Sequence, residues 1–501
     1  MLFPSKREKN VLYIEISGFI PKLKGIQDII SKRPSFLDIV DSIIKKGRKS
    51  YGIFADISSS NLTLSDAWEI KKAIEIVKRY GVKTVAYLRD GGIPEVFLSE
   101  SFDRVYTPEN AYFFLVGFSA TLNTFGEFFR KIKIKIESVK SGKLKSIPEL
   151  LTKSEVPDDI KKDVKRTISE IYETLSEETR KFSAQIFLKG ILSSKELMLN
   201  GVVDAITKEP ATEIIKKEFG SKEVEHIRKP IQIVSLKRGK TAAIINMSGI
   251  ISENPSPNFI SLSRYSDVIN RVNEDKNVET VIIRINSRGG DATVSEIIEE
   301  KIKSIKKTKI LSVSSIAASG GYLISLGSPK IFSTPFSLIG SIGVFLIKPY
   351  IGELTSTIGI NTEMISKGDY STMLSPYKEL SQKEKTALEN LVKEEHEKFI
   401  KLVAESRRIP EENVRKIADG SVFVGKKSKE LKLVDDIKSI SEIIHEITDS
   451  YHIEEYPKIS VFDFMRIGTL ENILNSQDIQ FLSKIAREKI SLLSYLPIDF
   501  V

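Results

Sequence analysis

Cysteine is absent from this 501-residue sequence, and histidine occurs only four times. The absence of cysteine excludes disulfide bonds, thiolate metal sites and a cysteine nucleophile. The histidines lack the paired spacing of a zinc-binding helix, because Ile400 stands where His396 and Glu397 would require a second histidine. We therefore expect no metal or other cofactor, and we expect the histidines to be surface or boundary residues. They are His226, His396, His445 and His452.

Long apolar runs are also absent. The N-terminal residues change quickly into an alternating strand pattern and lack the apolar core of roughly 7 to 15 residues that a signal peptide has. The most apolar stretch, Ile331 to Ile347, is 17 residues long but contains Pro335 and two glycines. We expect it to form a buried strand, turn and strand rather than a membrane span. With no export signal and no transmembrane helix predicted, we expect a cytoplasmic or peripheral membrane protein.

The remaining composition, 41% hydrophobic and 29% charged, is ordinary for a soluble globular protein. The length predicts about two to four domains. The net charge of +9 is a modest excess that is compatible with an acidic membrane surface but does not indicate nucleic acid. We expect no nucleic-acid partner.

The sequence repeats itself at an offset of about 230 residues, as a duplicated architecture would. YIEISGFI corresponds to AIINMSGII, and SKELMLNGVVDAI corresponds to SKELKLVDDI. Between them, YGIFADISSSNLTLSDAWEIKKAI matches ETVIIRINSRGGDATVSEIIEEKI, and VGFSATLNTFGEFFRKIKIKIESVKSGKLKS matches IGVFLIKPYIGELTSTIGINTEMISKGDYST. Four matches in the same order indicate an internal duplication.

Each copy alternates strand, turn and helix, as α/β units with parallel sheets do. We therefore predict an α/β fold with two tandem homologous domains, residues 1–230 and 231–450. Long helical patterns extend these domains, from Asp158 to Leu188 in the first and from Ser381 to Arg407 in the second. Residues 451–501 are predicted to form a helical tail, either a plain packing helix or one that takes part in oligomer or membrane-surface contacts.

Ser319 is the candidate nucleophile, because it follows a buried strand and precedes a Gly-Gly pair and an apolar helical stretch. At a helix N-terminus, backbone N–H groups would stabilise negative charge near its oxygen. Gly289 and Gly290 follow another buried strand, so their amides are candidates for an oxyanion hole. From the residues alone, plainer interpretations stay open: an N-cap serine with a flexible turn, and a glycine turn that requires positive φ.

A serine nucleophile needs a base, and neither copy has a histidine in its matched motifs. Lysine is the obvious substitute for the histidine of a triad. Lys145 follows a strand-like segment of the first copy, whereas Ser371 occupies its place in the second copy. Conversely, Asp90 occupies the place of Ser319 in the first copy. A lysine acts as a base only if its pKa is lowered toward neutrality, which burial favours, so the pattern alone does not separate Lys145 from a surface lysine.

These motifs resemble signal peptide peptidase A in its long, internally duplicated form. The resemblance covers about residues 12 to 445 and is carried by ISG, NSRGGDATVSE, AASGGYLIS, SLIGSIGV, SGKLKS and the SKEL closing motif. It implies two crotonase-like or Clp-protease-like α/β domains, with the catalytic serine in the C-terminal repeat and the catalytic lysine in the N-terminal repeat.

The resemblance also implies a role for each motif. Ser319 matches the nucleophile, Lys145 the general base, and Ser341 a serine that orients the lysine. Gly289 and Gly290 match the oxyanion-hole turn. The residue before them is Arg288, where the family usually has proline, so we expect a looser turn here.

The implied function is that of a serine endopeptidase that hydrolyses extended apolar peptides, such as cleaved signal peptides. An extended substrate would add alongside a strand near the active site. Family members assemble into rings, so we expect a homo-oligomer, with a tetramer as the favoured state. Long-form members usually carry an N-terminal membrane anchor, which adds membrane-surface association to the expected properties.

Two other functions compete with this one. A catalytically inactive oligomeric scaffold of the same fold would lack one member of the dyad, yet Ser319 and Lys145 are both present. A crotonase-type acyl-CoA enzyme would need a carboxylate near the glycine turn. Asp291 adjoins that turn, but Ser319, Lys145 and Ser341 would then have no purpose.

Overall fold

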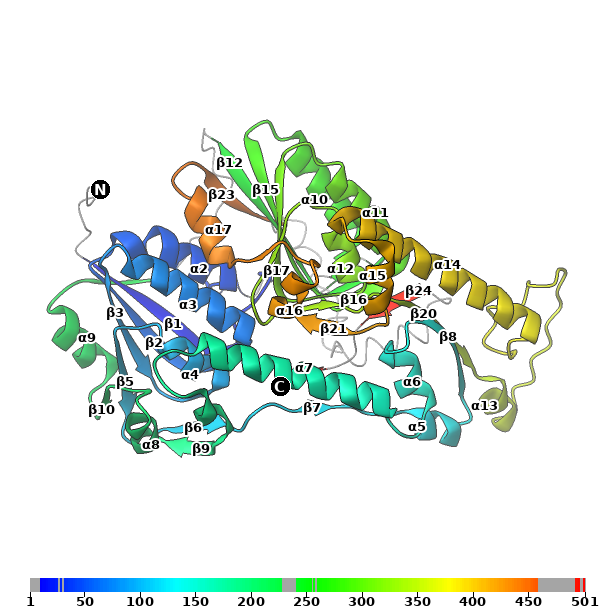
Figure 1. Ribbon diagram of the computed structural model, residues 1–501, viewed down its shortest axis with the longest axis horizontal. Coiled ribbons are helices and arrows are strands. Elements are labelled where there is room, and N and C mark those ends of the chain that lie inside the picture. Colours follow the sequence, from blue (N-terminus) through cyan, green and yellow to red (C-terminus); the bar gives the residue numbers. More distant parts are fainter. Residues whose placement is uncertain are drawn as a thin grey trace.

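The computed structural model describes residues 10–25, 28, 31–227, 240–254, 256, 259–457, 492–495 and 499–500. Its two principal sheets lie side by side with helices packed on them (Figure 1). A long arm, which contains helix α7 (Asp158–Glu178), runs along one side of the molecule. The predicted α/β fold with parallel sheets and helical extensions is confirmed.

The first sheet is formed by the N-terminal part of the chain, and all its strand pairs are parallel. Helices α2 (Phe36–Lys45) and α3 (Leu64–Lys78) bury their apolar faces against one side of it, and α9 (Ala211–Phe219) packs on the other. The strand order is β10 (Ala205–Thr207), β5 (Arg104–Pro108), β3 (Lys83–Leu88), β2 (Gly52–Ser60), β1 (Val11–Gly18) and β11 (Val224–His226).

The second sheet is formed by the C-terminal part of the chain and is also largely parallel. Its central strands are continuous apolar runs rich in valine and isoleucine, as expected for strands covered on both faces. Along the main path the order is β21 (Val422–Val424), β19 (Leu338–Gly340), β17 (Thr308–Ala318), β15 (Val278–Ser287), β12 (Thr241–Ser248) and β23 (His452–Tyr456). The apolar stretch that was predicted to be a buried strand, turn and strand contributes β18 (Ile331–Ser333), β19 and the start of β20 (Val344–Tyr350), so that prediction is confirmed.

The two sheets are joined by shared packing. Helix α17 (Ile440–Ile447) contacts α2 and α3, and its isoleucines belong to the same apolar cluster as the core of the first sheet. Below it, the guanidinium of Arg284 on β15 forms a buried ion pair with Glu69 on α3, with 2.9 Å between Nη1 and Oε1. The predicted domains 1–230 and 231–450 therefore share a core.

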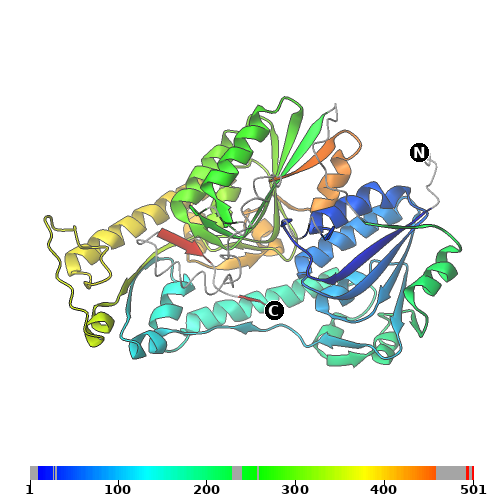
Figure 2. The ribbon, with the colours of Figure 1, turned by 180° about the vertical axis from the view of Figure 1, so that it is seen from behind.

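A third sheet brings the N-terminal part of the chain to the second sheet. Strand β8 (Lys135–Ser141) pairs antiparallel with β20, with Ser141 opposite Val344. The arm that carries β8 also contains α5 (Gly126–Lys131), α6 (Ser146–Thr152) and α7 (Asp158–Glu178), and the view from behind shows it extending away from the first sheet (Figure 2). The order of this sheet is β14 (Phe259–Ser261), β13 (Ile250–Ser252), β16 (Gly289–Asp291), β24 (Leu492–Tyr495), β20 and β8.

Both long helical patterns are present in the structure. The first becomes α7 followed by a 3-10 turn at Ala184–Leu188, and the second becomes α14 (Gln382–Arg407), which begins at the capping box of Ser381 and Glu384. The described residues of the tail form strands: β23 pairs with β12, β24 pairs with β16 and β20, and β25 (Asp499–Phe500) pairs with β7 (Ala120–Thr121). β23 lies at the edge of the second sheet, whereas β24 lies inside the third sheet between β16 and β20. Residues 458–491, where the rest of the helix was predicted, lie outside the described residues.

Within the described ranges, every helix is too short or too polar to cross a bilayer.

Candidate active site

Lys145 and Ser319 meet at the junction between the arm and the second sheet. Lys145 follows β8 and caps the N-terminus of α6, whereas Ser319 follows β17 and caps α12 (Gly320–Ser325). The distance between Lys145 Nζ and Ser319 Oγ is 2.5 Å, although the residues are 174 positions apart in the chain. The pairing of β8 with β20 creates this contact, because it brings the N-terminal arm alongside the strand that follows β19.

Ser319 occupies a strained corner between strand and helix. Its φ of 58° is in the left-handed region, which a residue with a side chain adopts at a cost of about 1–3 kcal/mol. The corner is held by a hydrogen bond from the Ser319 N–H to the Gly340 carbonyl, 2.7 Å, and by one from the Leu323 N–H to the Ser319 carbonyl, 2.9 Å. The side chain is buried, so its hydroxyl is directed into the protein toward Lys145.

The Lys145 amine is removed from water. The residue is 1% exposed, and burial lowers the pKa of its amine to about 7. Its Nζ lies 3.0 Å from both the carbonyl oxygen and the Oγ of Ser341. No carboxylate contacts this amine in the described structure, so nothing offsets the effect of burial on its charged form.

Ser341 therefore contacts the lysine, as the resemblance implied. It also has a positive φ, 52°, and its N–H donates to the Ser421 carbonyl at 2.6 Å. Two residues later, Gly343 allows the lysine side chain to pass: a Cβ at this glycine would lie 3.2 Å from Lys145 Cγ and 2.8 Å from the Ser141 carbonyl oxygen. Gly343 was not predicted as a site residue from the sequence.

Gly289 and Gly290 form β16, and β16 contacts α12, the helix that Ser319 caps. Gly290 has a φ of 154°, and a Cβ there would lie 2.1 Å from the Ile251 carbonyl oxygen, so only glycine fits. The Gly289 N–H donates to Ser287 Oγ at 3.1 Å. The structure thus places the glycine pair beside the serine corner, without a direct hydrogen bond from Gly289 to Ser319.

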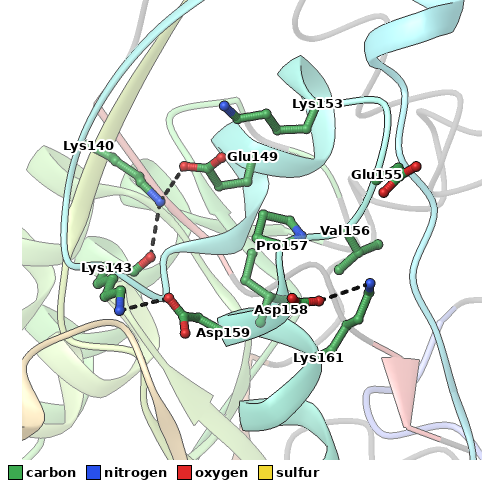
Figure 3. Close-up of a pocket in the computed structure, with 11 residues that line it drawn as sticks. Lys140, Lys143, Glu149, Lys153, Glu155, Val156, Pro157, Asp158, Asp159 and Lys161 are labelled. Atoms are coloured by element: carbon green, nitrogen blue, oxygen red, sulfur yellow. Dashed lines mark hydrogen bonds and ion pairs between the residues drawn. The ribbon is translucent and has the colours of Figure 1, made fainter.

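A charged pocket lies behind the turn that leads to Lys145 (Figure 3). Lys140 points into the turn, where it donates to the Lys143 carbonyl at 3.1 Å and the Lys145 carbonyl at 3.3 Å and pairs with Glu149 at 2.8 Å. Lys143 instead pairs with Asp159 at 2.7 Å and is largely exposed. The charges in this pocket are mostly paired with one another, and the lining includes neither Lys145 nor Ser319. We interpret it as the outer support of the lysine turn.

One residue near the site was assigned wrongly from the sequence. His396 was expected at the surface or a boundary, but it is buried on the packing face of α14. Its Nδ1 lies 2.5 Å from Ser141 Oγ, at the end of β8. Only the three-dimensional pairing of α14 with β8 could have identified this contact, because the two residues are 255 positions apart.

The arrangement can perform proton transfer between a hydroxyl and an amine. A buried lysine with a pKa near 7 is partly neutral at physiological pH, and a neutral amine at 2.5 Å can accept the hydroxyl proton of Ser319. A backbone turn beside the serine can offer N–H donors to a developing oxyanion.

Comparison with known proteins agrees with this chemistry. Residues 301–454 match the family described as Peptidase family S49. The chain is 26% identical over 451 residues to the chloroplastic serine protease SPPA of Arabidopsis thaliana, covering 85% of this chain and 67% of that protein. It is 24% identical over 466 residues to Protease 4 of Salmonella typhi, covering 84% of this chain and 74% of that protein.

Shorter or weaker similarities complete the comparison. A putative signal peptide peptidase SppA of Enterococcus faecium is 31% identical over 201 residues, covering 38% of this chain and 58% of its own. Among solved structures, ClpP1 from Listeria monocytogenes covers 39% of this chain and 91% of its own at 17% identity. Its TM-score of 0.26 is too low to support a fold assignment. The S49 match and the relatives that align over most of the chain show a serine-type peptidase that is similar to proteins of the signal peptide peptidase A family.

Proposed function

We propose that this chain is an endopeptidase whose nucleophile is Ser319 and whose general base is Lys145. The observation that carries the proposal is the 2.5 Å contact between Ser319 Oγ and a buried lysine amine whose pKa is lowered to about 7. In its neutral form the amine has two N–H donors and one lone pair. The two Ser341 oxygens can accept both N–H groups, which leaves the lone pair directed at the Ser319 hydroxyl.

Hydrolysis then follows in two stages. Ser319 Oγ attacks the scissile carbonyl carbon while Lys145 takes the hydroxyl proton, and Lys145 returns that proton to the leaving amine as the C–N bond breaks. Lys145 then takes a proton from water, whose oxygen attacks the acyl carbon, and Lys145 returns this proton to Ser319 Oγ as the ester C–O bond breaks and the acid product leaves. Ser341 holds the lysine in position throughout.

The amides of Gly289 and Gly290 are the proposed oxyanion donors. Since the Gly289 N–H donates to Ser287 Oγ, binding the oxyanion there requires this hydrogen bond to be exchanged. Ser287 Oγ itself donates to the Gly249 carbonyl at 2.7 Å and so stays anchored during the exchange. Because Arg288 stands where the family usually has proline, we expect the backbone of this turn to be flexible enough for the exchange.

The proposed substrate is an extended, apolar peptide such as a cleaved signal peptide. Strands β16 and β20 leave a gap in the third sheet that accepts a strand antiparallel to both. The chain's own β24 occupies that gap, pairing Gly290 with Ser494 and Phe345 with Leu493. A substrate that added in the same way would present its backbone to the glycine turn, and buried apolar residues of β20, Val344 to Ile347, line the approach.

We further propose that the dyad joins two repeats within one chain. Residues 1–230 supply the lysine through the β8 arm, and residues 231–450 supply the serine. In the first sheet β1 is followed by β2, a helix and β3, and Asp90 lies just after β3. In the second sheet β12 is followed by β15, a helix and β17, and Ser319 lies just after β17. This common succession supports the duplication predicted from the sequence.

A homo-oligomer, with a tetramer as the favoured state, is the proposed assembly. The sequence repeat aligns β8 with residues 361–367, which form no strand in the described structure. Ile358, Ile360 and Ile365 in this region are 64%, 52% and 96% exposed. An apolar segment without a partner strand is suited to pair with another copy of the chain, or to contact a membrane surface.

The decisive experiment is intact-mass analysis after reaction with a serine-directed fluorophosphonate, followed by peptide mapping. We expect one adduct on Ser319 in wild type, none in Ser319→Ala, and much slower labelling in Lys145→Met. Lys143→Met is the matched control, because Lys143 lies two positions away but is exposed, and it should label at the wild-type rate. A folded wild-type protein that neither labels nor cleaves apolar peptides would refute the dyad.

A further inference from the structure

His396 contacts Ser141, where β8 ends and the turn toward Lys145 begins. Helix α14 packs on β8 and β20 through Leu388 and Val392, which belong to one apolar cluster with Val139 and Val344. His396 lies one turn further along the same helix face and is 9% exposed. Its ring therefore reaches the end of β8, where the chain turns toward Lys145.

The partner of His396 is the last residue of that strand. Nδ1 and Ser141 Oγ are 2.5 Å apart, whereas Nε2 has no hydrogen-bond partner in the described structure. Ser141 also pairs with Val344 of β20, and its carbonyl oxygen faces Gly343. The hydrogen bond thus holds the end of β8, which leads to Lys145, at the start of β20, which follows Ser341.

We propose that His396 is a positioning residue that holds the turn from Ser141 to Lys145, and with it the lysine amine, against Ser319 and Ser341. This inference rests on the proposed function of the dyad. The ring works as a neutral group. Burial lowers the pKa of His396 below its ordinary value; the charge of Glu397 opposes this shift, and the charge of Lys145 adds to it.

The charged groups around the turn come from several elements. Lys140 on β8 and Glu149 on α6 pair with each other on the outer side, and Glu397 on α14 pairs with Arg415. The Leu144 N–H donates to the backbone carbonyl of Asp419, before β21. These charged groups form ion pairs with one another. The hydrogen bond between His396 and Ser141 therefore holds the turn through two groups without net charge.

Loss of this support should move the amine and admit water. Displacement of a reacting group by about 1 Å costs roughly a hundredfold in rate, so we expect kcat to fall by about tenfold to a hundredfold with KM nearly unchanged. Hydration of the amine weakens the effect of burial, so the acid limb of the kcat/KM profile should move to higher pH. A substitution that only destabilised the fold would lower the amount of active enzyme without moving this limb.

The test uses His396→Phe, Ser141→Ala and the double variant in the full chain, with peptide hydrolysis and fluorophosphonate labelling measured against pH. His396→Phe keeps the ring and removes the hydrogen bond, while His396→Asn, which keeps a polar group near the Nδ1 position, should recover part of the rate. The double variant should be no slower than the worse single variant, because both changes remove one interaction. His445→Phe, on α17 beside Tyr80, is the matched control and should behave as wild type.

The outcomes separate this inference from the proposed function. If wild type does not label at Ser319, the dyad itself fails. If wild type labels normally while Ser141→Ala and His396→Phe keep its rate and pH profile, or if their effects multiply in the double variant, the positioning role of His396 is overturned.

Discussion

The corner that holds Ser319 in the second sheet has a counterpart in the first sheet, and the two carry opposite chemistry. In the first sheet Asp90 follows β3 and precedes Gly91-Gly92 and α4 (Ile93–Ser99). Its carboxylate accepts hydrogen bonds from the Ser59 N–H at 2.7 Å and from Ser58 Oγ at 3.0 Å. In the second sheet the same corner presents a hydroxyl to a lysine amine.

The glycine turn differs in the same way. Ser59 and Ser60 stand where the second sheet has Gly289 and Gly290, and the Ser60 N–H donates to Glu95 at 3.1 Å. Burial raises the pKa of Asp90, but the hydrogen bonds from Ser59 and Ser58 outweigh it and hold that pKa below its ordinary value. Carboxylates of the chain itself thus engage the amides of the first corner. The comparison teaches that the corner is a feature of both sheets and that the side chains around it set its chemistry.

Removing the lysine should produce the largest change. In Lys145→Met we expect peptide hydrolysis to fall by about a thousandfold or more, because members of a catalytic unit act together. The same variant should be more stable near pH 7, by an amount on the order of 2–4 kcal/mol, since it no longer buries an amine whose pKa is lowered to about 7.

The sign of this stability effect follows from proton linkage. Between about pH 7 and pH 10 the unfolded lysine holds a proton that the folded lysine has lost, so the unfolding free energy of wild type rises with pH across this range. Lys145→Met should lack this rise. Urea unfolding of both proteins at several pH values tests it, and parallel pH profiles would contradict the burial of the amine.

Making the second corner resemble the first should have the next largest effect. Gly290→Ser introduces the residue found at the equivalent position of the first copy, and its Cβ would lie 2.1 Å from the Ile251 carbonyl oxygen. Strand β16 must shift, and we expect kcat to fall by about a hundredfold or more, similar to the loss of an oxyanion donor. Circular dichroism and labelling of Ser319 show whether the fold and the nucleophile persist. Unchanged kcat in the folded variant would exclude this turn from the oxyanion hole.

The pH dependence of wild type should report the lysine. Because only the neutral amine accepts a proton, kcat/KM should rise about tenfold per pH unit below pH 7 and level off above it. A rate profile from pH 5 to pH 9 checks this. A plateau that extends down to pH 5 would indicate another base.

Emptying the gap between β16 and β20 should have a moderate effect. A substrate strand has to displace β24, which is tethered to the same chain and competes at high effective concentration. Deletion of residues 492–501 should therefore raise kcat/KM by roughly threefold to tenfold, mainly through KM. Peptide hydrolysis by the truncated and full chains measures this, with thermal unfolding as the control. Equal KM values would argue that substrates bind elsewhere.

The smallest effect on activity is expected in the first corner. Asp90→Ser recreates the serine of the second corner but has no lysine beside it, so we expect one fluorophosphonate adduct per chain and a rate within about twofold of wild type. Stability should fall by only about 0.5–1.5 kcal/mol, because the exposed Ser59 N–H loses its acceptor but can be hydrated. A second adduct, at position 90, would show that the first corner is itself reactive.

The residues of the proposed dyad were easier to select from the sequence than the residues that support them. Ser319 and Lys145 could be chosen because local motifs and the resemblance marked them. Their contact depends on the pairing of β8 with β20, a long-range event that no local pattern encodes. The Glu69–Arg284 pair and the His396–Ser141 bond were not foreseen for the same reason: each joins residues more than 200 positions apart, and each residue alone has the appearance of an ordinary surface group.

The tail shows the same limit. Its described residues form strands whose partners lie far away in the sequence, so no local pattern could give these pairings. The helical pattern itself, residues 459–490, lies outside the described residues. The helices α7 and α14 were placed well because they are long and carry clear terminal signals such as Ser381.

The 174-residue separation of Lys145 and Ser319 also matters while the protein is being made. Synthesis at about 5–20 residues per second delivers the serine roughly 10–35 seconds after the lysine. During that interval the nascent chain has no nucleophile, and afterwards activity still awaits the docking of the β8 arm on β20. For the proposed dyad, translation of the C-terminal part of the chain and docking of the β8 arm on β20 must therefore both precede activity.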